Sequence, residues 1–119
     1  MKLRLTESSV RLRLRRSEVE AFRRDGSVEV STHLPAGESI TYRLTGVAID
    51  QPAVALTAGL LEIRVPAGAA RQWASTDQVG LYYPVGALQI LVEKDFRRTS
   101  APSPDDDDRY PNPRSAAPR

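Results

Sequence analysis

The sequence predicts a small α+β domain that is mostly β, in which two pseudo-symmetric strand-helix-strand-strand units form a curved sheet or a small barrel with two short helices. Three observations support this fold class. Apolar and polar residues alternate over several short segments, two segments have helical signals, and the order of these segments recurs after 51 residues. Alternation is typical of strands, because successive side chains on a strand point to opposite faces.

The clearest strand is predicted over residues 10–15, where alternation is unbroken and Val10, Leu12 and Leu14 are expected to face the core. Leu61–Val65 repeats this pattern in the second unit. Further strands are predicted over 2–5, 27–31, 40–44, 79–83 and 88–92, which makes seven, and the connection between the units has room for another near 54–56.

Each unit has a short predicted helix after its first strand. In the first unit Ser17 is the expected N-cap, Glu20 completes a capping box, and Asp25–Gly26 ends the helix. In the second unit Pro66 ends the strand or opens the helix, and Thr76–Asp77 ends it. The helix residues expected to be buried are Val19, Phe22, Ala70, Trp73 and Ala74.

The two units align with each other along most of their length. A shift of 51 residues pairs Phe22 with Trp73, whereas the last strands align at a shift of 48, so the hairpin loops differ in length by three residues. Turns are expected at Pro35–Gly37 and Pro84–Gly86. Because strands, helix and turn recur in one order, we interpret them as an internal duplication. The predicted repeat covers residues 10–45 and 61–93.

Residues 1–96 are expected to form one domain with a single core, and residues 97–119 form a polar tail that is acidic and rich in proline. The chain has no cysteine, which excludes disulfides, thiolate metal sites and cysteine nucleophiles. No apolar stretch is long enough for a secretion signal or a membrane span. A cytoplasmic protein without a membrane partner is therefore expected.

One resemblance concerns the fold alone. Val10-Arg-Leu12, a short helix and then Asp25–Val30 resemble the duplicated element of double-psi and related cradle-loop barrels. Thr76–Val79 departs from that pattern, because it lacks the usual Gly-Asp order. The resemblance implies a barrel topology and says nothing about function.

A second resemblance covers nearly the whole chain. Its motifs are Lys2–Leu5, Ser9–Leu14 with Ser17–Val19, Trp73, Asp77–Gly80, Leu91–Phe96, Asp105–Asp108 and Tyr110–Pro113. Through these motifs the chain resembles a family of small, uncharacterised bacterial proteins. A cysteine that the family has soon after its Lys-Asp-Phe motif is absent here, which implies that this position has no thiol-based activity. The family implies no reaction.

Arginines form the best candidate site in the sequence. Arg11, Arg13 and Arg15 share one face of the first clear strand, and Arg64 holds the position equivalent to Arg13 in the second unit. Forked guanidinium groups bind phosphate and carboxylate, so these residues predict an anion site. The plainer interpretation is that they pair across the solvated face of a sheet with Glu29, Glu62 or Glu93.

Three carboxylates, Glu62, Glu93 and Asp95, form an alternative site. They predict a small metal-dependent hydrolase of a phosphorylated substrate, in which they bind a metal or act as acid and base. An ordinary exposed strand end also explains them. The sequence has no glycine-rich phosphate loop, nucleophile elbow or histidine-carboxylate metal motif. His33, beside a turn, is expected to be solvated, and no catalytic residue, metal site or cofactor is predicted.

Arg16, Arg23 and Arg24 around the first helix suggest a further hypothesis, weak nucleic-acid binding through phosphate contacts. Acidic residues interleave with these arginines, and Glu20 stands four positions before Arg24, so local ion pairing also accounts for the pattern. Nucleic acid is not the expected partner.

The tail offers one more candidate. Tyr110, Pro111, Asn112 and Pro113 place an aromatic side chain beside stiff prolines, a combination that can dock into a groove on this domain or on a partner. An idle tail is the alternative, with Asp105–Asp108 as a solvated acidic spacer. Taken together, the sequence predicts a non-catalytic binding or interaction module for a protein partner or a small anionic ligand, and it does not predict the oligomeric state.

Overall fold

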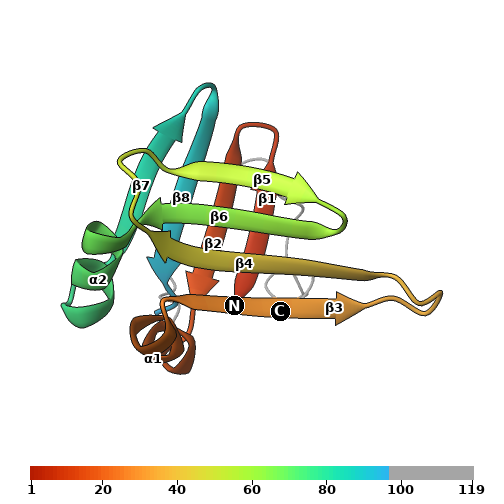
Figure 1. Ribbon diagram of the computed structural model, residues 1–119, viewed down its shortest axis with the longest axis horizontal. Helices are drawn as coiled ribbons and strands as arrows, with labels where there is room; N and C mark the ends of the chain where they lie inside the picture. The colour runs from red at the N-terminus through yellow and green to blue at the C-terminus, as the bar shows by residue number, and fades with distance from the viewer. Residues whose placement is uncertain (97–119) are drawn as a thin grey trace, which may run out of the picture.

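The computed structural model describes residues 1–96, so the predictions for the tail 97–119, including Tyr110–Pro113, lie outside the described residues. Within residues 1–96 the chain forms eight strands and two helices (Figure 1). This confirms the predicted α+β, mostly β fold class. The strand beyond the predicted seven is the short one in the connection between the two units.

The elements follow the predicted order along the chain. Strand β1 (Lys2–Thr6) precedes the first unit, which consists of β2 (Ser9–Leu14), α1 (Arg16–Asp25), β3 (Ser27–His33) and β4 (Ser39–Val47). Strand β5 (Ala53–Thr57) lies in the connection and precedes the second unit, which consists of β6 (Leu60–Pro66), α2 (Ala67–Ser75), β7 (Gly80–Val85) and β8 (Leu88–Lys94).

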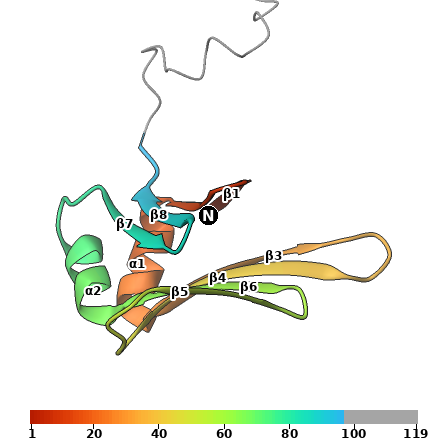
Figure 2. The ribbon, with the colours of Figure 1, turned by 90° about the horizontal axis from the view of Figure 1, so that it is seen from above.

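The strands form two four-stranded sheets, with the orders β1-β2-β8-β7 and β3-β4-β6-β5. In Figure 1 the strands of the two sheets cross at a steep angle, and in Figure 2 the sheets are separate layers with both helices at one side. Residues 1–96 do not close into a barrel, so the barrel alternative is not realised. Each helix connects a strand of one sheet to a strand of the other. The strand before the helix of a unit and the two strands after it therefore belong to different sheets.

The two sheets share one internal arrangement. In each, two strands form an antiparallel hairpin, β1 with β2 or β5 with β6, and the second strand of the hairpin lies parallel to the last strand of the other unit, β8 or β4. Leu12 lies opposite Val92 in one parallel pair, and Ile63 lies opposite Leu44 in the other. Ile63 follows Leu12 by 51 residues, and Val92 follows Leu44 by 48. The two sequence shifts therefore relate residues that occupy corresponding positions in the two parallel strand pairs.

The core lies between the sheets and extends beneath the helices. The alternating residues Val10, Leu12 and Leu14 are buried as predicted. Phe22 of α1 and Trp73 of α2 are also buried, and their rings meet edge to face with centroids 6.0 Å apart. The two aromatic residues that the predicted repeat pairs with each other are therefore in contact, and they join α1 to α2.

Helix α1 begins earlier than predicted. Its N-cap is Arg15, and the backbone N–H of Arg15 donates to Glu18 Oε1 at 2.8 Å. The predicted cap Ser17 is already inside the helix, and Glu20 pairs with Arg23 instead of closing a capping box. The helix ends as predicted, with Gly26 at φ +79° and its N–H 2.7 Å from the carbonyl of Phe22.

The second predicted turn also differs from the structure. Pro84 lies within β7, opposite Gln89, and the turn is made by Gly86 and Ala87, with Gly86 at φ +61°. Proline is tolerated there because β7 is an edge strand, where a missing N–H breaks no ladder bond. Pro84 therefore lies in the strand just before the turn and not in the turn itself.

Candidate functional site

Two of the predicted anion-binding arginines lie beside a carboxylate of the neighbouring strand. Arg11 Nε and Arg13 Nε, on β2, are 3.2 and 3.7 Å from Glu93 Oε1 on β8. That oxygen is buried and makes no hydrogen bond among residues 1–96, so the pairing is ionic without hydrogen-bond geometry. The hydroxyl of Tyr82 donates to Glu93 Oε2 at 3.0 Å, and burial together with this bond raises the pKa of Tyr82.

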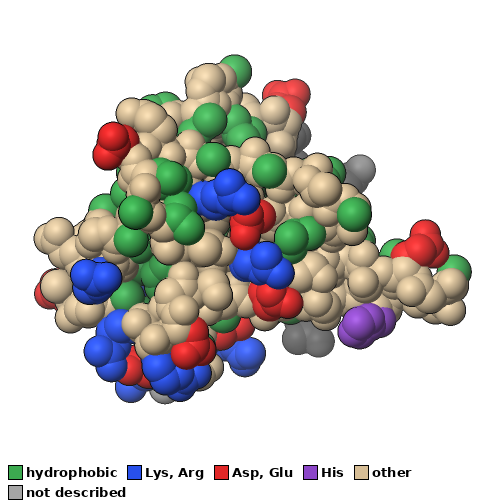
Figure 3. Space-filling view, viewed as in Figure 1, with side chains coloured by type: hydrophobic (Ala, Val, Ile, Leu, Met, Phe, Trp, Pro, Cys, Tyr) green, Lys and Arg blue, Asp and Glu red, His purple; other side chains and the backbone are tan. Residues whose placement is uncertain are grey.

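Arg64 belongs to a second charged cluster on the other sheet. Its Nε donates to Glu62 Oε1 at 2.7 Å, while Arg43 lies between Glu62 and Glu29 with its Nε 2.8 Å from Glu29 Oε1. Basic and acidic side chains accordingly alternate across the front of this sheet in Figure 3. The hydrogen bond from Arg64, opposed by burial and assisted by Arg43 and Thr45, lowers the pKa of Glu62.

The four predicted arginines therefore do not converge on one place. Arg11 and Arg13 lie on one sheet, Arg64 lies on the other, and Arg15 stands at the start of α1 with its Nε 3.7 Å from Glu18 Oε1. Each has a carboxylate of this chain within ion-pair distance. An incoming anion at any of these positions would compete with a carboxylate that is already there.

The alternative set of carboxylates is divided in the same way. Glu62 lies on β6, whereas Glu93 lies on β8 of the other sheet and Asp95 directly follows that strand. Asp95 Oδ2 is 3.4 Å from Lys2 Nζ. Over residues 1–96, no three or more His, Cys, Asp or Glu side chains gather in a group that could hold a metal ion. His33 ends β3 and is exposed.

Glu18 has a structural role that the sequence did not reveal. Besides the backbone N–H of Arg15, its carboxylate binds the N-terminal ammonium of Met1, whose side chain is buried. Burial opposes ionisation of Glu18, but the hydrogen bonds from Met1 and Arg15 and the attraction of their charges outweigh it, and the pKa of Glu18 is lowered. The start of the chain is thereby attached to the first turn of α1.

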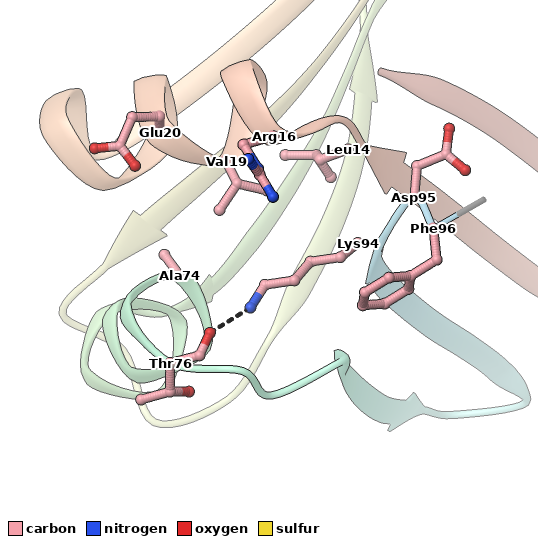
Figure 4. A pocket seen from close by; sticks show the side chains of 9 residues that line it. All are labelled: Leu14, Arg16, Val19, Glu20, Ala74, Thr76, Lys94, Asp95 and Phe96. Carbon is pink, nitrogen blue, oxygen red and sulfur yellow. Dashed lines mark hydrogen bonds between the residues drawn. The ribbon is translucent and has the colours of Figure 1, made fainter.

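A groove lies where the two helices meet the end of β8. Its volume is about 340 Å³. Its lining residues come from the ends of β2 and β8, from α1 and α2, and from the residues that follow α2 and β8 (Figure 4): Leu14, Arg16, Val19, Glu20, Ala74, Thr76, Lys94, Asp95 and Phe96. Apolar side chains from four segments thus form its walls, and charged groups stand among them.

The carboxylates and the cations of this groove are oriented differently. Figure 4 shows the Glu20 and Asp95 carboxylates turned away from the centre, and both have partners elsewhere, Arg23 and Lys2. The side chains of Arg16 and Lys94 instead point into the space between the helices. The groove therefore presents positive charge above an apolar floor.

Neither cation of the groove has a carboxylate partner within residues 1–96. Lys94 Nζ donates to the backbone carbonyl of Thr76 at 2.5 Å and lies 5.8 Å from the centre of the Trp73 ring. Arg16 takes part in no ion pair or side-chain hydrogen bond of the described part, unlike Arg23 and Arg24 on the same helix. This distinguishes the groove from the arginine clusters on the sheets.

Sequence reasoning did not find this groove. The sequence places Arg16 with other arginines around the first helix, and it assigns Lys94 no role in a site. Their proximity depends on α1 and α2 both packing beside the end of β8, which no local pattern specifies. The available signal is that Arg16 lies between the predicted strand 10–15 and the predicted helix, and that Lys94 and Phe96 follow the predicted strand 88–92.

The described residues thus form a small two-sheet α+β domain with a groove that two cations without carboxylate partners enter. The chain belongs to a family of unknown function, DUF7009, whose model matches residues 1–114. This confirms the predicted resemblance to a family without an assigned function. No curated protein and no solved structure matches the chain. In residues 1–96 neither helix is long and apolar enough to cross a membrane.

Proposed function

We propose that this protein is a non-catalytic binding module whose groove between α1, α2 and the end of β8 binds an acidic, extended peptide segment. The observation that carries the proposal is the pair of cations, Arg16 and Lys94, that point into an apolar groove and have no carboxylate partner in the described part. Every arginine of the predicted anion site, by contrast, already pairs with a carboxylate of the chain.

The lining favours a peptide over a free inorganic anion. A small anion needs only the two cations, whereas Val19, Ala74 and Phe96 supply apolar surface that such an anion cannot cover. Phe96 is 60% exposed and stands at the rim, where an apolar or aromatic side chain of a ligand can pack on its ring. A segment with carboxylates and an aromatic residue uses both features.

The positions of the carboxylates support a hydrolase less well than they support a binding module. Glu62 and Glu93 lie on different sheets, and the groove's own acids, Glu20 and Asp95, are held by Arg23 and Lys2. A hydrolase needs a metal or an acid and base around one substrate position. The residues that the sequence suggested for those roles are not brought together.

The proposal is tested by titrating a fluorescein-labelled peptide of four aspartates and following its anisotropy. The protein is the full chain with Asp105–Asp108 each replaced by asparagine, called here the four-Asn variant, so that its own acidic run cannot compete. We expect Arg16→Gln to weaken binding about fivefold, or about 1 kcal/mol, because one charge-assisted hydrogen bond is lost. Lys94→Gln is expected to act in the same direction.

Arg71→Gln is the matched control. It removes the same charge from an exposed position of α2 that does not line the groove. Binding that falls equally with Arg71→Gln and Arg16→Gln would mean a general charge effect and would contradict the proposed site. Binding that neither Arg16→Gln nor Lys94→Gln changes would do so as well.

A further inference from the structure

We infer that the acidic segment that occupies this groove is the chain's own Asp105–Pro113, bound in cis. The inference rests on the proposed function, since it names the ligand of the same groove. It combines three observations: where the described chain ends, which residues follow, and how far the family match extends.

The described chain ends in the groove itself. Phe96 is its last residue and one of the lining residues, so residues 97–119 begin at the rim. Nine positions separate Phe96 from Asp105. By the general relation for random-coil chains, nine residues span roughly 15–18 Å, which is enough to cross a groove of this size. Such a short tether gives an effective concentration on the order of millimolar, so weak contacts suffice for binding in cis.

The chemistry of the segment matches the lining. Asp105–Asp108 supply carboxylates for Arg16 and Lys94, which lack such partners within residues 1–96. Tyr110 supplies an aromatic ring for the apolar wall and for the exposed ring of Phe96. The prolines on either side of Asn112 reduce the conformational entropy that binding removes.

The extent of the family match supports a role for the segment. The family model covers residues 1–114, which includes the whole of Asp105–Pro113 and ends one residue later. The match to the family model therefore extends over this stretch as well as over the two-sheet domain. An idle tail gives no reason for the match to continue past the domain and stop directly after the aromatic-Pro-Asn-Pro motif.

The test uses paramagnetic relaxation in the full chain. Because the chain contains no cysteine, Ser115→Cys provides a single attachment site for a nitroxide, two residues beyond Pro113. We expect the nitroxide to broaden the amide signals of Arg16, Ala74 and Thr76. The amides of the β3–β4 turn, which lies at the end away from the helices in Figure 2, are expected to stay sharp.

Substitutions in the segment provide the controls, and they leave residues 1–96 unchanged. Tyr110→Ala and the four-Asn variant are each expected to abolish the broadening, whereas Tyr110→Phe, which keeps the ring, is expected to retain it. Weak broadening spread over the whole surface would overturn the inference. Broadening seen only when spin-labelled chains are mixed with isotope-labelled chains would also overturn it, since the segment would then bind another copy.

The anisotropy titration separates this inference from the proposed function. If the segment occupies the groove, the four-aspartate peptide should bind the unmodified chain roughly tenfold more weakly than the four-Asn variant. Equal affinities would overturn the inference and leave the proposed function intact. Failure of the peptide to bind either protein in an Arg16-dependent manner would remove the proposed function, and the inference with it.

Discussion

Individual charged residues of this chain serve two different purposes. Arg11, Arg13 and Arg64 are held by glutamates on the outer faces of the sheets, whereas Arg16 and Lys94 point into a groove without such partners. Ion pairs with an exposed arginine, such as that of Arg64 with Glu62, contribute little to stability, typically below about 1 kcal/mol each. Within residues 1–96, Arg16 and Lys94 differ from these arginines in having no carboxylate partner.

Glu18 is the residue at which we expect the clearest effect of pH on stability. Its pKa is lowered in the folded chain, so its contribution is present above the unfolded value of about 4.3 and is lost as pH falls through the folded value. We expect Glu18→Gln to lower the free energy of unfolding by about 1 kcal/mol at pH 7. Below pH 3 the difference should largely disappear.

Urea unfolding at both pH values measures this effect. Glu20→Gln is the control, because Glu20 is on the same helix but pairs only with exposed Arg23, and its loss should be smaller. An equal decrease in the free energy of unfolding for the two variants at pH 7 would contradict a specific stabilising contact of Glu18 with Met1 and Arg15.

Sequence reasoning succeeded where one residue's position decides its environment. Alternation identified Val10, Leu12 and Leu14 as core residues, and the helical spacing identified Trp73 as buried. It failed where two side chains from distant segments share a partner. The start of α1 was placed too late because Ser17 and Glu20 match a capping box, whereas Glu18 takes that role and also binds the N-terminus.

At the scale of elements, the contact between α1 and α2 joins the two units. Phe22 and Trp73 meet edge to face, and Gly46 of β4 lies beside Phe22, where an added Cβ would be in ordinary contact at 3.4 Å from Phe22 Cζ. Both helices also line the groove. The packing that closes the core therefore also sets the spacing of the groove walls.

A double-mutant cycle measures that contact. We expect Phe22→Leu and Trp73→Leu to show a coupling of about 0.5–1.5 kcal/mol, because the first substitution already removes the aromatic pair. Trp73→Leu combined with Leu56→Ala is the control, since Leu56 is 73% exposed at the end of β5 and its effect should simply add. A coupling near zero for the aromatic pair would mean that the rings act only through the area they bury.

At the scale of the whole molecule, the strands were predicted but their partners were not. Alternation reports which face of a strand is buried, and it does not say which strand lies beside it. The parallel pairs β2–β8 and β4–β6 join the beginning of one unit to the end of the other. The division of the strands into two sheets therefore could not be predicted from the pattern of each strand alone. The same exchange brings Arg16 and Lys94 together, which is why the groove was missed.

The central claim is that the groove, and not the arginine faces of the sheets, is the binding site. Amide chemical-shift mapping of the four-Asn variant with the four-aspartate peptide tests it most directly. We expect shifts confined to the two helix ends and the end of β8, including Arg16, Thr76 and Lys94. Shifts centred on Arg11, Arg13 or Arg64 would place the anion on the outer faces of the sheets and contradict the account.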